Sequence, residues 1–380
     1  MLGNYITVDG VSSRTLGLFC KQLPMFPVAV RGFNATTVGG RLDDIYQSAN
    51  HFGDIQLDIE AVLIGFDMDP VIRYFTAGKK LVFSNIPDRY AVIRQLVAID
   101  QQRVGNGALE LKITLKCSPF KYSTANTPKE YYASPGYFKT VGTIYSEPLI
   151  MAKGCWPGFA FSLNGTAITT NGLDSISELV GPGKNLCPNG IENGAYSRGV
   201  TASVGTDGSV TLSGTADSNG DPAFVLFPNT TWPAGTYHVS GCPAGGATAK
   251  YRIDVVAGGT AYRDTGSGVN FTLASDATVM AQIVVYRGKA TPTDPFYPMI
   301  CKKSDYDADP TYEPYGAVDL YFDVQNRVVY TLVNGEKTVV QEHTSGNIWD
   351  LLLVPSDTEY NELIFANASK MSITPNERWL

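Results

Sequence analysis

The sequence predicts a mainly β protein with more than one domain. Its 380 residues exceed what one ordinary hydrophobic core organises, so two or three domains are expected. The chain contains 38 glycines and 22 prolines besides many tyrosines, a composition typical of strands joined by tight turns. Short segments alternate apolar and polar residues, which is the period of a half-buried strand.

Residues 1–130 are expected to form a first β domain. Segments 54–60 and 109–115 place their apolar residues at every second position, as a strand with one buried face does. A further short strand is predicted at 81–83. These segments predict a sheet that has one face on a core.

One short helix is predicted inside this domain. Asp69 can cap its N-terminus, and Pro70 suits its first turn. Ile72 and Phe75 supply an apolar stripe, and Gly78 is expected to end the helix.

Residues 131–183 and 316–380 are expected to build one β-sandwich together. Each part is too small to bury its own strands. Asn-Gly pairs at 164–165 and 334–335 predict hairpin turns, because both central residues of such a turn adopt left-handed conformations. Insertion of another module between the two parts is physically easy, since both of its ends leave from neighbouring points.

Residues 184–315 are expected to form the inserted module. This stretch is rich in glycine, threonine, serine and alanine and poor in long aliphatic residues. Turn signals recur at short intervals, for example at 206–208, 218–220, 233–235 and 257–259. Short strands at regular spacing indicate a second β-sandwich, of jelly-roll type.

Charge and cysteine content exclude several classes of protein. The formal net charge of −7, without any basic run, argues against a specific nucleic-acid-binding surface. No apolar stretch could span a bilayer, and the start lacks the layout of a signal peptide, so we expect a protein made and kept in the cytosol until assembly or lysis. The six cysteines stand singly, without a CxxC pair, and are expected to be free thiols.

Histidines give no sign of catalysis. The three histidines, His51, His238 and His343, lie in different segments, so a metal or acid-base cluster is not expected. GxSxG, HExxH and P-loop motifs are absent from the sequence. We therefore expect no enzyme, no cofactor and no bound metal.

Carboxylates are the remaining candidates, because glycosidases need only two of them. The adjacent aspartates 43–44 and the pair Asp58 and Glu60 have suitable spacing, but alternating acids on the outer face of a strand are ordinary in a solvated sheet. The acids at 305–309 resemble the start of a calcium loop, yet Pro310 stands where that loop needs glycine. A plain acidic loop is expected there, although a looser cation site remains open.

Aromatic residues of the inserted module are the strongest candidates for a binding role. Trp232, Tyr237, Tyr251, Tyr262 and Tyr286 lie among small polar residues. Such rings stack on the apolar faces of sugars, so they are candidate carbohydrate-binding residues. The alternative is that they build the core of the module. We expect Trp232, which precedes a proline in a turn-rich stretch, to be the most exposed of the five.

Short sequence phrases follow one another in a fixed order along about two-thirds of the chain. These phrases are residues 5–13, 70–83, Tyr90, 146–150, Asn164-Gly165 and 373–380. Through this order the outer segments resemble the distal tail proteins (the Dit family) of siphophages, a group of phage tail components. The inserted module is similar to the carbohydrate-binding-type sandwiches found inserted in phage tail and baseplate proteins, through residues 184–186, 235–242, 296–300 and 311–315.

The resemblance implies a structural virion protein at the distal end of a long, non-contractile tail. It implies a hexameric ring built by the N-terminal domains, with a galectin-like sandwich on the outside of each subunit. Such rings dock on the tail-tube protein above and the tail-tip hub below, and the insert would bind saccharide of the host cell wall. The alternatives are a protein that serves mainly in host adhesion, and a glycan-cleaving tail enzyme.

Overall fold

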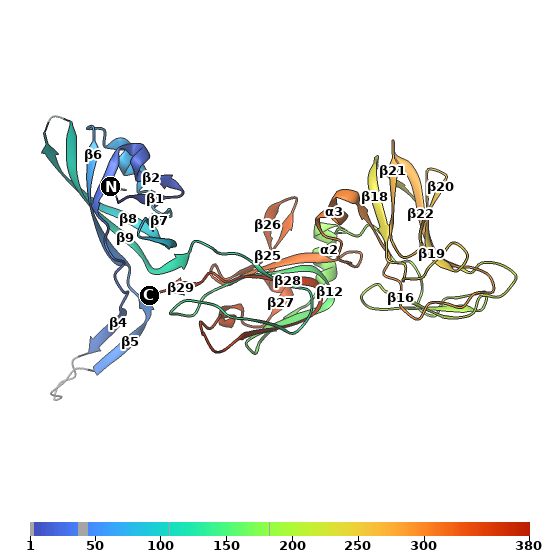
Figure 1. Cartoon of the computed structure of the whole chain (residues 1–380). Helices are drawn as coiled ribbons and strands as arrows, with labels where there is room; N and C mark the ends of the chain where they lie inside the picture. Colours follow the sequence, from blue (N-terminus) through green and yellow to red (C-terminus); the bar gives the residue numbers. More distant parts are fainter. Residues whose placement is uncertain (1–3, 37–44, 106, 182) are drawn as a thin grey trace.

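The structure, a computed structural model, describes residues 4–36, 45–105, 107–181 and 183–380. Asp43 and Asp44 lie outside these residues, and the side chain of His51 is not described either. The prediction of a mainly β protein built of β-sandwich domains is confirmed. Three bodies follow one another in space: an N-terminal domain, a central sandwich and, at the far end, the inserted module (Figure 1). Buried apolar residues form a separate cluster in each body.

The N-terminal sheet contains the longest strands of the chain. Its order along the sheet is β2 (Val11–Ser12), β1 (Ile6–Val8), β7 (Lys80–Phe83), β8 (Ile86–Val104), β9 (Ala108–Ser123), β6 (Ile55–Ile64) and β3 (Leu18–Gln22). Strands β6 and β9 pair antiparallel with Leu57 opposite Leu115, and the residues of β6 alternate between buried and exposed. The alternation read from the sequence therefore fixes which face of the sheet covers the core.

The predicted helix is present but shorter than expected. Helix α1 spans Asp69–Tyr74, and Asp69 is its first helical residue instead of its cap. The prediction for Ile72 was wrong, since its side chain is exposed, whereas Phe75 is fully buried as expected. The helix ends before Gly78 because the backbone of Phe75 is no longer helical. Gly78 lies in a later turn, with φ +87°. A short 3₁₀ turn, η1 (Ser13–Leu16), precedes β3.

Two strands leave the sheet as an arm. β4 (Arg31–Thr36) and β5 (Ile45–Phe52) pair only with each other and project away from the N-terminal sheet (Figure 1). Between β3 and the arm, residues 23–30 run without helix or strand.

The central sandwich is built from two separate parts of the sequence. Its main path runs β10 (Lys129–Tyr131), β28 (Asn361–Thr374), β12 (Leu149–Leu163), β24 (Val318–Asp323), β25 (Val328–Val333) and β26 (Glu336–Val339). The long strands β12 and β28 pair along most of their length, with a register shift between Cys155 and Ala160. Before the shift β12 also pairs with β24, and after it with β13 (Thr166–Thr170), so the two long strands serve both layers.

Shorter elements complete the sandwich. They are β11 (Gly136–Phe138), helix α2 (Leu173–Val180), the 3₁₀ turns η2 (Gln341–His343) and η3 (Ile348–Asp350), and β27 (Thr344–Ser345). Both predicted hairpins are present. Asn164 and Gly165 have φ of +50° and +84°, and Asn334 and Gly335 have +52° and +83°, the left-handed pair that a tight two-residue turn requires.

The inserted module holds three small sheets around its own core. They contain β14 (Tyr196–Ser197), β15 (Val200–Val204) and β16 (Val210–Gly214); β17 (Ala223–Trp232), β22 (Ala277–Val285), β19 (Tyr251–Ala257) and β20 (Thr260–Asp264); and β21 (Val269–Leu273), β18 (Gly235–Ser240) and β23 (Met299–Lys302). The acidic segment expected as a loop is in fact mostly helical, as α3 (Lys303–Ala308), because it continues directly from β23.

The end of the chain returns to the first domain. β29 (Arg378–Trp379) pairs with β9 at Tyr122 and Lys121. Arg378 also donates to a carboxylate oxygen of Glu147 at 3.0 Å. The sandwich is thus tied to the N-terminal domain at both of its ends.

Candidate binding pocket and assembly surface

The inserted module begins with a segment that separates two pockets. Leu186 and Pro188 line an apolar pocket of about 380 Å³. The alternate residues Asn185, Cys187 and Asn189 line a larger and more polar cleft of about 490 Å³. The two sites therefore lie on opposite sides of the same short segment.

Aromatic rings form the wall of the apolar pocket. Phe227 and Trp232 from β17 and Tyr237 from β18 line it, together with Tyr315 from the segment that returns to the sandwich. Tyr315 is 49% exposed and also lines the polar cleft, so the two sites meet at its ring. Lys302, at the end of β23, is the one charged residue of the lining.

Strand pairing and a tight turn bring these residues together. Trp232 ends β17, and the chain turns back within three residues to begin β18. The Tyr237 hydroxyl donates to the carbonyl oxygen of Pro233 at 2.8 Å, which fixes its ring against this turn. Lys302 lies directly opposite Tyr237 in the β18–β23 pair, and side chains of opposed residues project from the same face of a sheet.

The expectation that Trp232 is exposed was wrong. Trp232 is 7% exposed, because it belongs to the buried apolar cluster of the module. Phe227 stacks on it with ring centroids 5.5 Å apart and planes 9° apart, and the tilted ring of Tyr237 lies 5.2 Å from it. Phe271 stacks in turn on Tyr237 at 5.2 Å. Trp232 therefore builds the core of the module and contributes little exposed surface to the pocket.

The five aromatic candidates divide into two groups. Tyr262 packs on Phe271 with centroids 5.3 Å apart and so joins the stack behind Trp232 and Tyr237. Tyr251 and Tyr286 line neither of the two pockets. The Tyr251 hydroxyl donates to the carbonyl oxygen of Ala244 at 2.8 Å.

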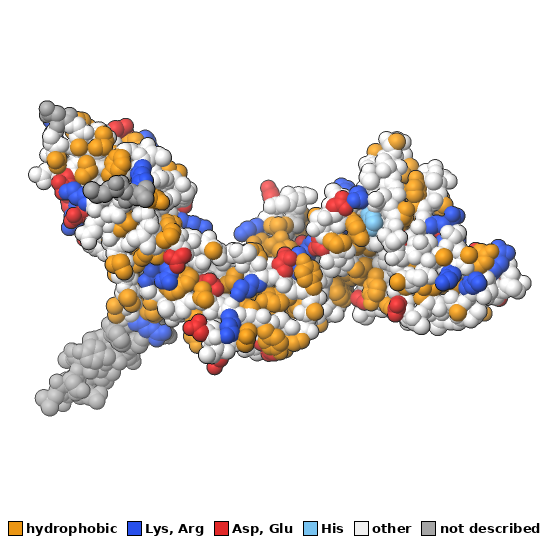
Figure 2. All heavy atoms as spheres, in the orientation of Figure 1, with side chains coloured by type: hydrophobic (Ala, Val, Ile, Leu, Met, Phe, Trp, Pro, Cys, Tyr) orange, Lys and Arg blue, Asp and Glu red, His pale blue; other side chains and the backbone are white. Residues whose placement is uncertain are grey.

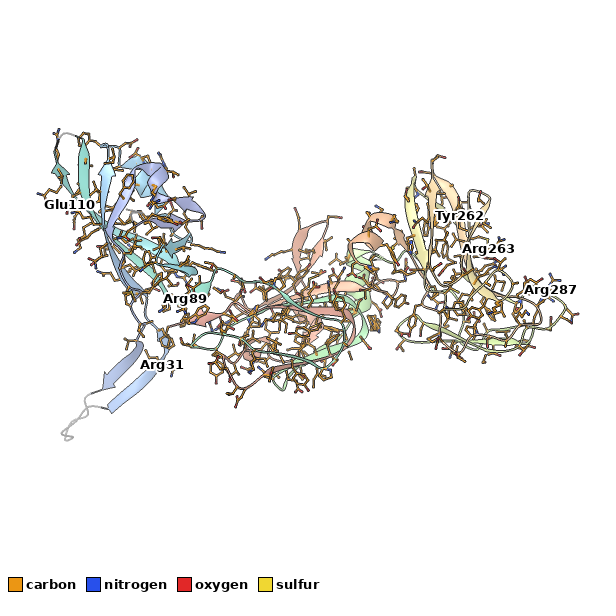
Figure 3. All side chains as sticks on the ribbon, in the orientation of Figure 1. Arg31, Arg89, Glu110, Tyr262, Arg263 and Arg287 are labelled. Carbon is orange, nitrogen blue, oxygen red and sulfur yellow. The ribbon has the colours of Figure 1, made fainter. Side chains whose placement is uncertain are left out.

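Tyr286 has a charged neighbour away from the aromatic stack. Tyr262 and its neighbour Arg263 lie on β20, whereas Arg287 lies farther out in the module (Figure 3). The Arg287 guanidinium lies 5.7 Å from the ring centroid of Tyr286. Two of the five predicted residues, Trp232 and Tyr237, thus meet at one pocket.

Lys302 and Tyr315 were missed from the sequence. Lys302 follows three buried residues of β23, and nothing in that run distinguishes it from an ordinary surface lysine. Tyr315 lies in an irregular return segment, where no periodicity indicates which way a side chain faces. Strand register would have been the only signal, because it sets Lys302 against Tyr237.

The polar cleft lies between the inserted module and the sandwich. Trp156 from β12 and the acids Asp174 and Glu178 from α2 line one side, and Asn189 and Tyr312 line the other. The Nε1 atom of Trp156 is buried and has no hydrogen-bond partner among the described residues. The cleft thus offers two exposed carboxylates to a polar molecule.

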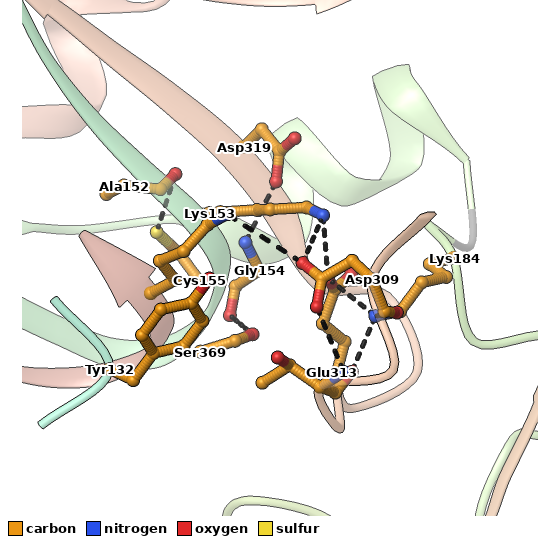
Figure 4. A network of polar contacts seen from close by, with 12 residues as sticks. Tyr132, Ala152, Lys153, Gly154, Cys155, Lys184, Asp309, Glu313, Asp319 and Ser369 are labelled. Carbon is orange, nitrogen blue, oxygen red and sulfur yellow. Dashed lines mark hydrogen bonds and ion pairs between the residues drawn. The ribbon is translucent and has the colours of Figure 1, made fainter. Parts of the chain in front are cut away.

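An ion network fastens the inserted module to the sandwich (Figure 4). Lys153 on β12 contacts Asp309 at 2.7 Å and Glu313 at 3.6 Å, and Lys184 contacts Glu313 at 3.0 Å. Burial alone would raise the pKa of Asp309, but hydrogen bonds from Lys153 and Thr311 outweigh it and hold that pKa below its usual value. The network therefore favours charged Asp309 at neutral pH.

Close backbone packing accompanies this network. Gly154 donates its N–H to Asp319 at 2.8 Å, and burial raises the pKa of that carboxyl group. Gly154 has φ +59°, and a Cβ atom there would come within 2.7 Å of the Glu313 side chain. Glycine is required at this position because both its conformation and the space exclude a side chain.

The N-terminal domain exposes an unusual number of apolar side chains. Met25, Val28 and Val30, in the extended segment 23–30, are 74%, 67% and 71% exposed. Figure 2 shows hydrophobic side chains open to solvent on this domain. Other exposed apolar residues of the domain are Val11, Phe19, Ile64, Phe66, Ile72, Val97 and Val104. We call segment 23–30 with its three exposed side chains the N-terminal apolar segment.

The other candidates from the sequence do not come together as sites. In the described part of the chain, no three histidine, cysteine or acidic residues are placed to hold a metal ion. Asp58 accepts a hydrogen bond from the Thr114 hydroxyl at 2.8 Å on the exposed face of the sheet. His238 stacks on Tyr306 with ring centroids 3.6 Å apart, and the nearest acid to His343 is its neighbour Glu342.

Comparisons with known proteins give one similar structure among those that match. No family model and no curated protein matches the sequence. The chain is similar to the crystal structure of the Dit protein of SPP1, described as a paradigm of the hub adsorption apparatus in phages that infect Gram-positive bacteria. The TM-score is 0.43 and the identity 10%, with 99% of each chain covered. Across the described residues, no helix has the length and hydropathy needed to cross a membrane.

Proposed function

We propose that this protein is a structural subunit at the distal end of a phage tail, where it forms a ring through its N-terminal domains. The observation that carries the proposal is the N-terminal apolar segment, which leaves Met25, Val28 and Val30 in water. Contiguous apolar side chains on a folded surface are typical of interfaces between proteins. The short sequence phrases that resemble distal tail proteins support the same assignment.

The extended order of the three bodies fits such a role. The N-terminal domain lies at one end and the inserted module at the other (Figure 1). A ring made by the N-terminal domains would hold the sandwiches and the inserted modules outward. In this proposal six subunits close the ring, the tail-tube protein stacks on one side, and the tail-tip hub docks on the other.

The inserted module is proposed to bind saccharide of the host surface. Its pocket is concave and aromatic, and rings stack on the C–H faces of sugars. Several modules on one ring would bind a cell together, so weak binding by one copy would suffice. In this proposal the protein is not an enzyme, because the paired acids weighed from the sequence, Asp58 and Glu60, lie on the strand β6 of a solvated sheet and not together in a pocket.

Replacement of the exposed methionine and valine tests the assembly. Met25→Glu combined with Val28→Glu puts two charges on the N-terminal apolar segment, and both side chains already face solvent, so the fold of the subunit should be retained. We expect the double variant to stay monomeric under conditions in which the natural chain forms rings, as measured by light scattering on a sizing column.

The matched control is Tyr196→Glu, on an equally exposed ring of the inserted module. This variant should assemble like the natural chain. If the double variant also assembles unchanged, the N-terminal apolar segment is not the interface. If the natural chain itself forms no ring, the protein is better described as a host-adhesion protein, and the inserted module carries its function.

A further inference from the structure

The apolar pocket contains a cation that the fold itself does not use. Lys302 lines the pocket and is exposed. No ion pair joins Lys302 to an acid in the described part of the chain, whereas its neighbour Lys303 is paired with Asp307. A lysine fixed opposite Tyr237 by strand register, and left without a counter-charge, is free to meet a charge on a ligand.

We propose that the apolar pocket binds a sugar unit that carries an anionic substituent, with Lys302 as its counter-ion. This inference rests on the proposed saccharide-binding role of the inserted module and names the class of saccharide. Phosphate and carboxylate substituents share the chemistry that a lysine ammonium recognises.

The size and lining of the pocket suit one sugar ring. Its volume of about 380 Å³ lies near the lower end of small-molecule pockets. The exposed ring of Tyr315 offers aromatic surface to the C–H face of a pyranose, and Phe227, Trp232 and Tyr237 line the same pocket. An aromatic wall without a cation would select neutral sugars, so Lys302 is the residue that sets the preference for an anionic sugar.

Polar groups for the sugar hydroxyls are also present. Thr230 and Thr231 line the same pocket with exposed side chains. The hydroxyl of Thr230 donates to the carbonyl oxygen of Pro228 at 3.0 Å, so its lone pairs remain available to accept from a ligand.

Charges on the neighbouring helix do not cancel this preference. Asp305 and Asp307 of α3 are exposed but do not line the pocket. Lys303 neutralises Asp307 one turn along the helix. The charge that faces the pocket is therefore that of Lys302.

Titration of the full chain with four probes tests the proposal. The probes are glucose 6-phosphate, glucuronic acid, glucose and inorganic phosphate, and binding is followed by ligand-observed NMR. We expect at least one of the two anionic sugars to bind more tightly than glucose, and inorganic phosphate, which lacks a ring to stack, to bind most weakly. A preference for glucose 6-phosphate assigns the substituent as phosphate, and a preference for glucuronic acid assigns it as carboxylate.

Substitution of the lysine isolates its contribution. Lys302→Gln should weaken binding of the preferred anionic sugar about fivefold, as loss of an exposed ion pair does, and leave glucose binding unchanged. The matched control Lys303→Gln removes the adjacent charge outside the pocket. It should change neither the binding of the anionic sugar nor the binding of glucose. Tyr315→Ala should weaken binding of all three sugars, because it removes the stacking surface.

Two results would overturn the inference. Equal affinity for glucose and both anionic sugars would show that the pocket does not discriminate between charged and neutral sugars. The saccharide-binding role would still stand. Failure of every sugar to bind would remove that role as well. Light scattering on the same samples judges ring assembly separately, so these failures can be told apart.

Discussion

Trp232 packs against other rings, and this burial determines what its removal costs. Its ring centroid lies 5.5 Å from that of Phe227 and 5.2 Å from that of Tyr237. The aromatic stack thus contributes to the stability of the inserted module as well as to the wall of its pocket. Loss of binding after a change at Trp232 would therefore be ambiguous, which is why Tyr315 and Lys302 are the better probes of binding.

Trp232→Ala should lower the free energy of unfolding of the inserted module by about 3–5 kcal/mol, since a large buried ring leaves a cavity. Tyr286→Ala, outside the stack, should cost less than about 1 kcal/mol. Urea unfolding of the full chain, followed by circular dichroism, measures both. Equal losses in the two variants would contradict the burial of Trp232.

The cysteines give a second prediction at this scale. All six are buried single thiols. Burial raises the pKa of Cys20 and of Cys301 to about 11, so little thiolate exists near pH 8. Ellman's reagent at pH 8 should label the folded chain slowly and label all six thiols after denaturation. Rapid labelling of the folded chain would show that a thiol is accessible and ionised.

Sequence reasoning placed aromatic residues in the inserted module but could not tell which were buried. The reason lies in β17, whose pairing with β22 shifts register between Val225 and Phe227 and again between Phe227 and Thr230. Each shift changes which face of the strand the following side chains occupy. Simple alternation along the sequence therefore loses the orientation of Trp232.

At the scale of elements, the junction of the inserted module depends on an ion network. Lys153 lies on β12, whereas Asp309 and Glu313 lie close together in the segment after α3, and all three side chains are largely buried. Because the pKa of Asp309 is held below its usual value of 3.8, this group stabilises the fold at higher pH. That contribution declines as the pH falls below 3.8, where the unfolded chain takes up a proton first.

Asp309→Asn should lower the free energy of unfolding at pH 7 by about 1.5–3 kcal/mol, the size of a charge-assisted hydrogen bond. The difference from the natural chain should shrink as the pH falls below 3.8. Thermal unfolding across this pH range measures it. Asp307→Asn, at an exposed pair, is the control and should cost less than about 1 kcal/mol. A deficit that persists unchanged at low pH would contradict the role of Asp309.

Strands were easier to predict than helices. The strand at 54–60 and the Asn-Gly hairpins follow from local pattern alone, and the structure contains them. Helix α2 was missed, because a glycine precedes its first residue and no capping residue marks its start. Helix α3 was read as a loop, since acids spaced for a calcium loop also suit a short exposed helix. Tertiary contacts decide whether such short segments form a helix.

At the scale of the whole molecule, the proposed assembly surface and the proposed binding pocket lie far apart. The N-terminal domain carries the exposed apolar segment, and the inserted module carries the pocket at the opposite end (Figure 1). The amino-acid composition, which becomes rich in glycine, threonine, serine and alanine in the inserted module, indicated that this module is a separate part of the chain. The partner surfaces could not be read from the sequence, because an exposed and a buried valine look alike in an alternating pattern. The limits of the domains at 130, 183 and 315 stay predictions.

The most direct test of the proposed ring is the mass and shape of the purified full chain. Light scattering on a sizing column, over a wide range of concentration, gives the number of subunits, and negative-stain electron microscopy of the same fractions gives the shape. We expect closed particles of about six subunits, with a central hole and the inserted modules at the periphery. A monomer at every concentration, also in the presence of tail tubes, would contradict the account.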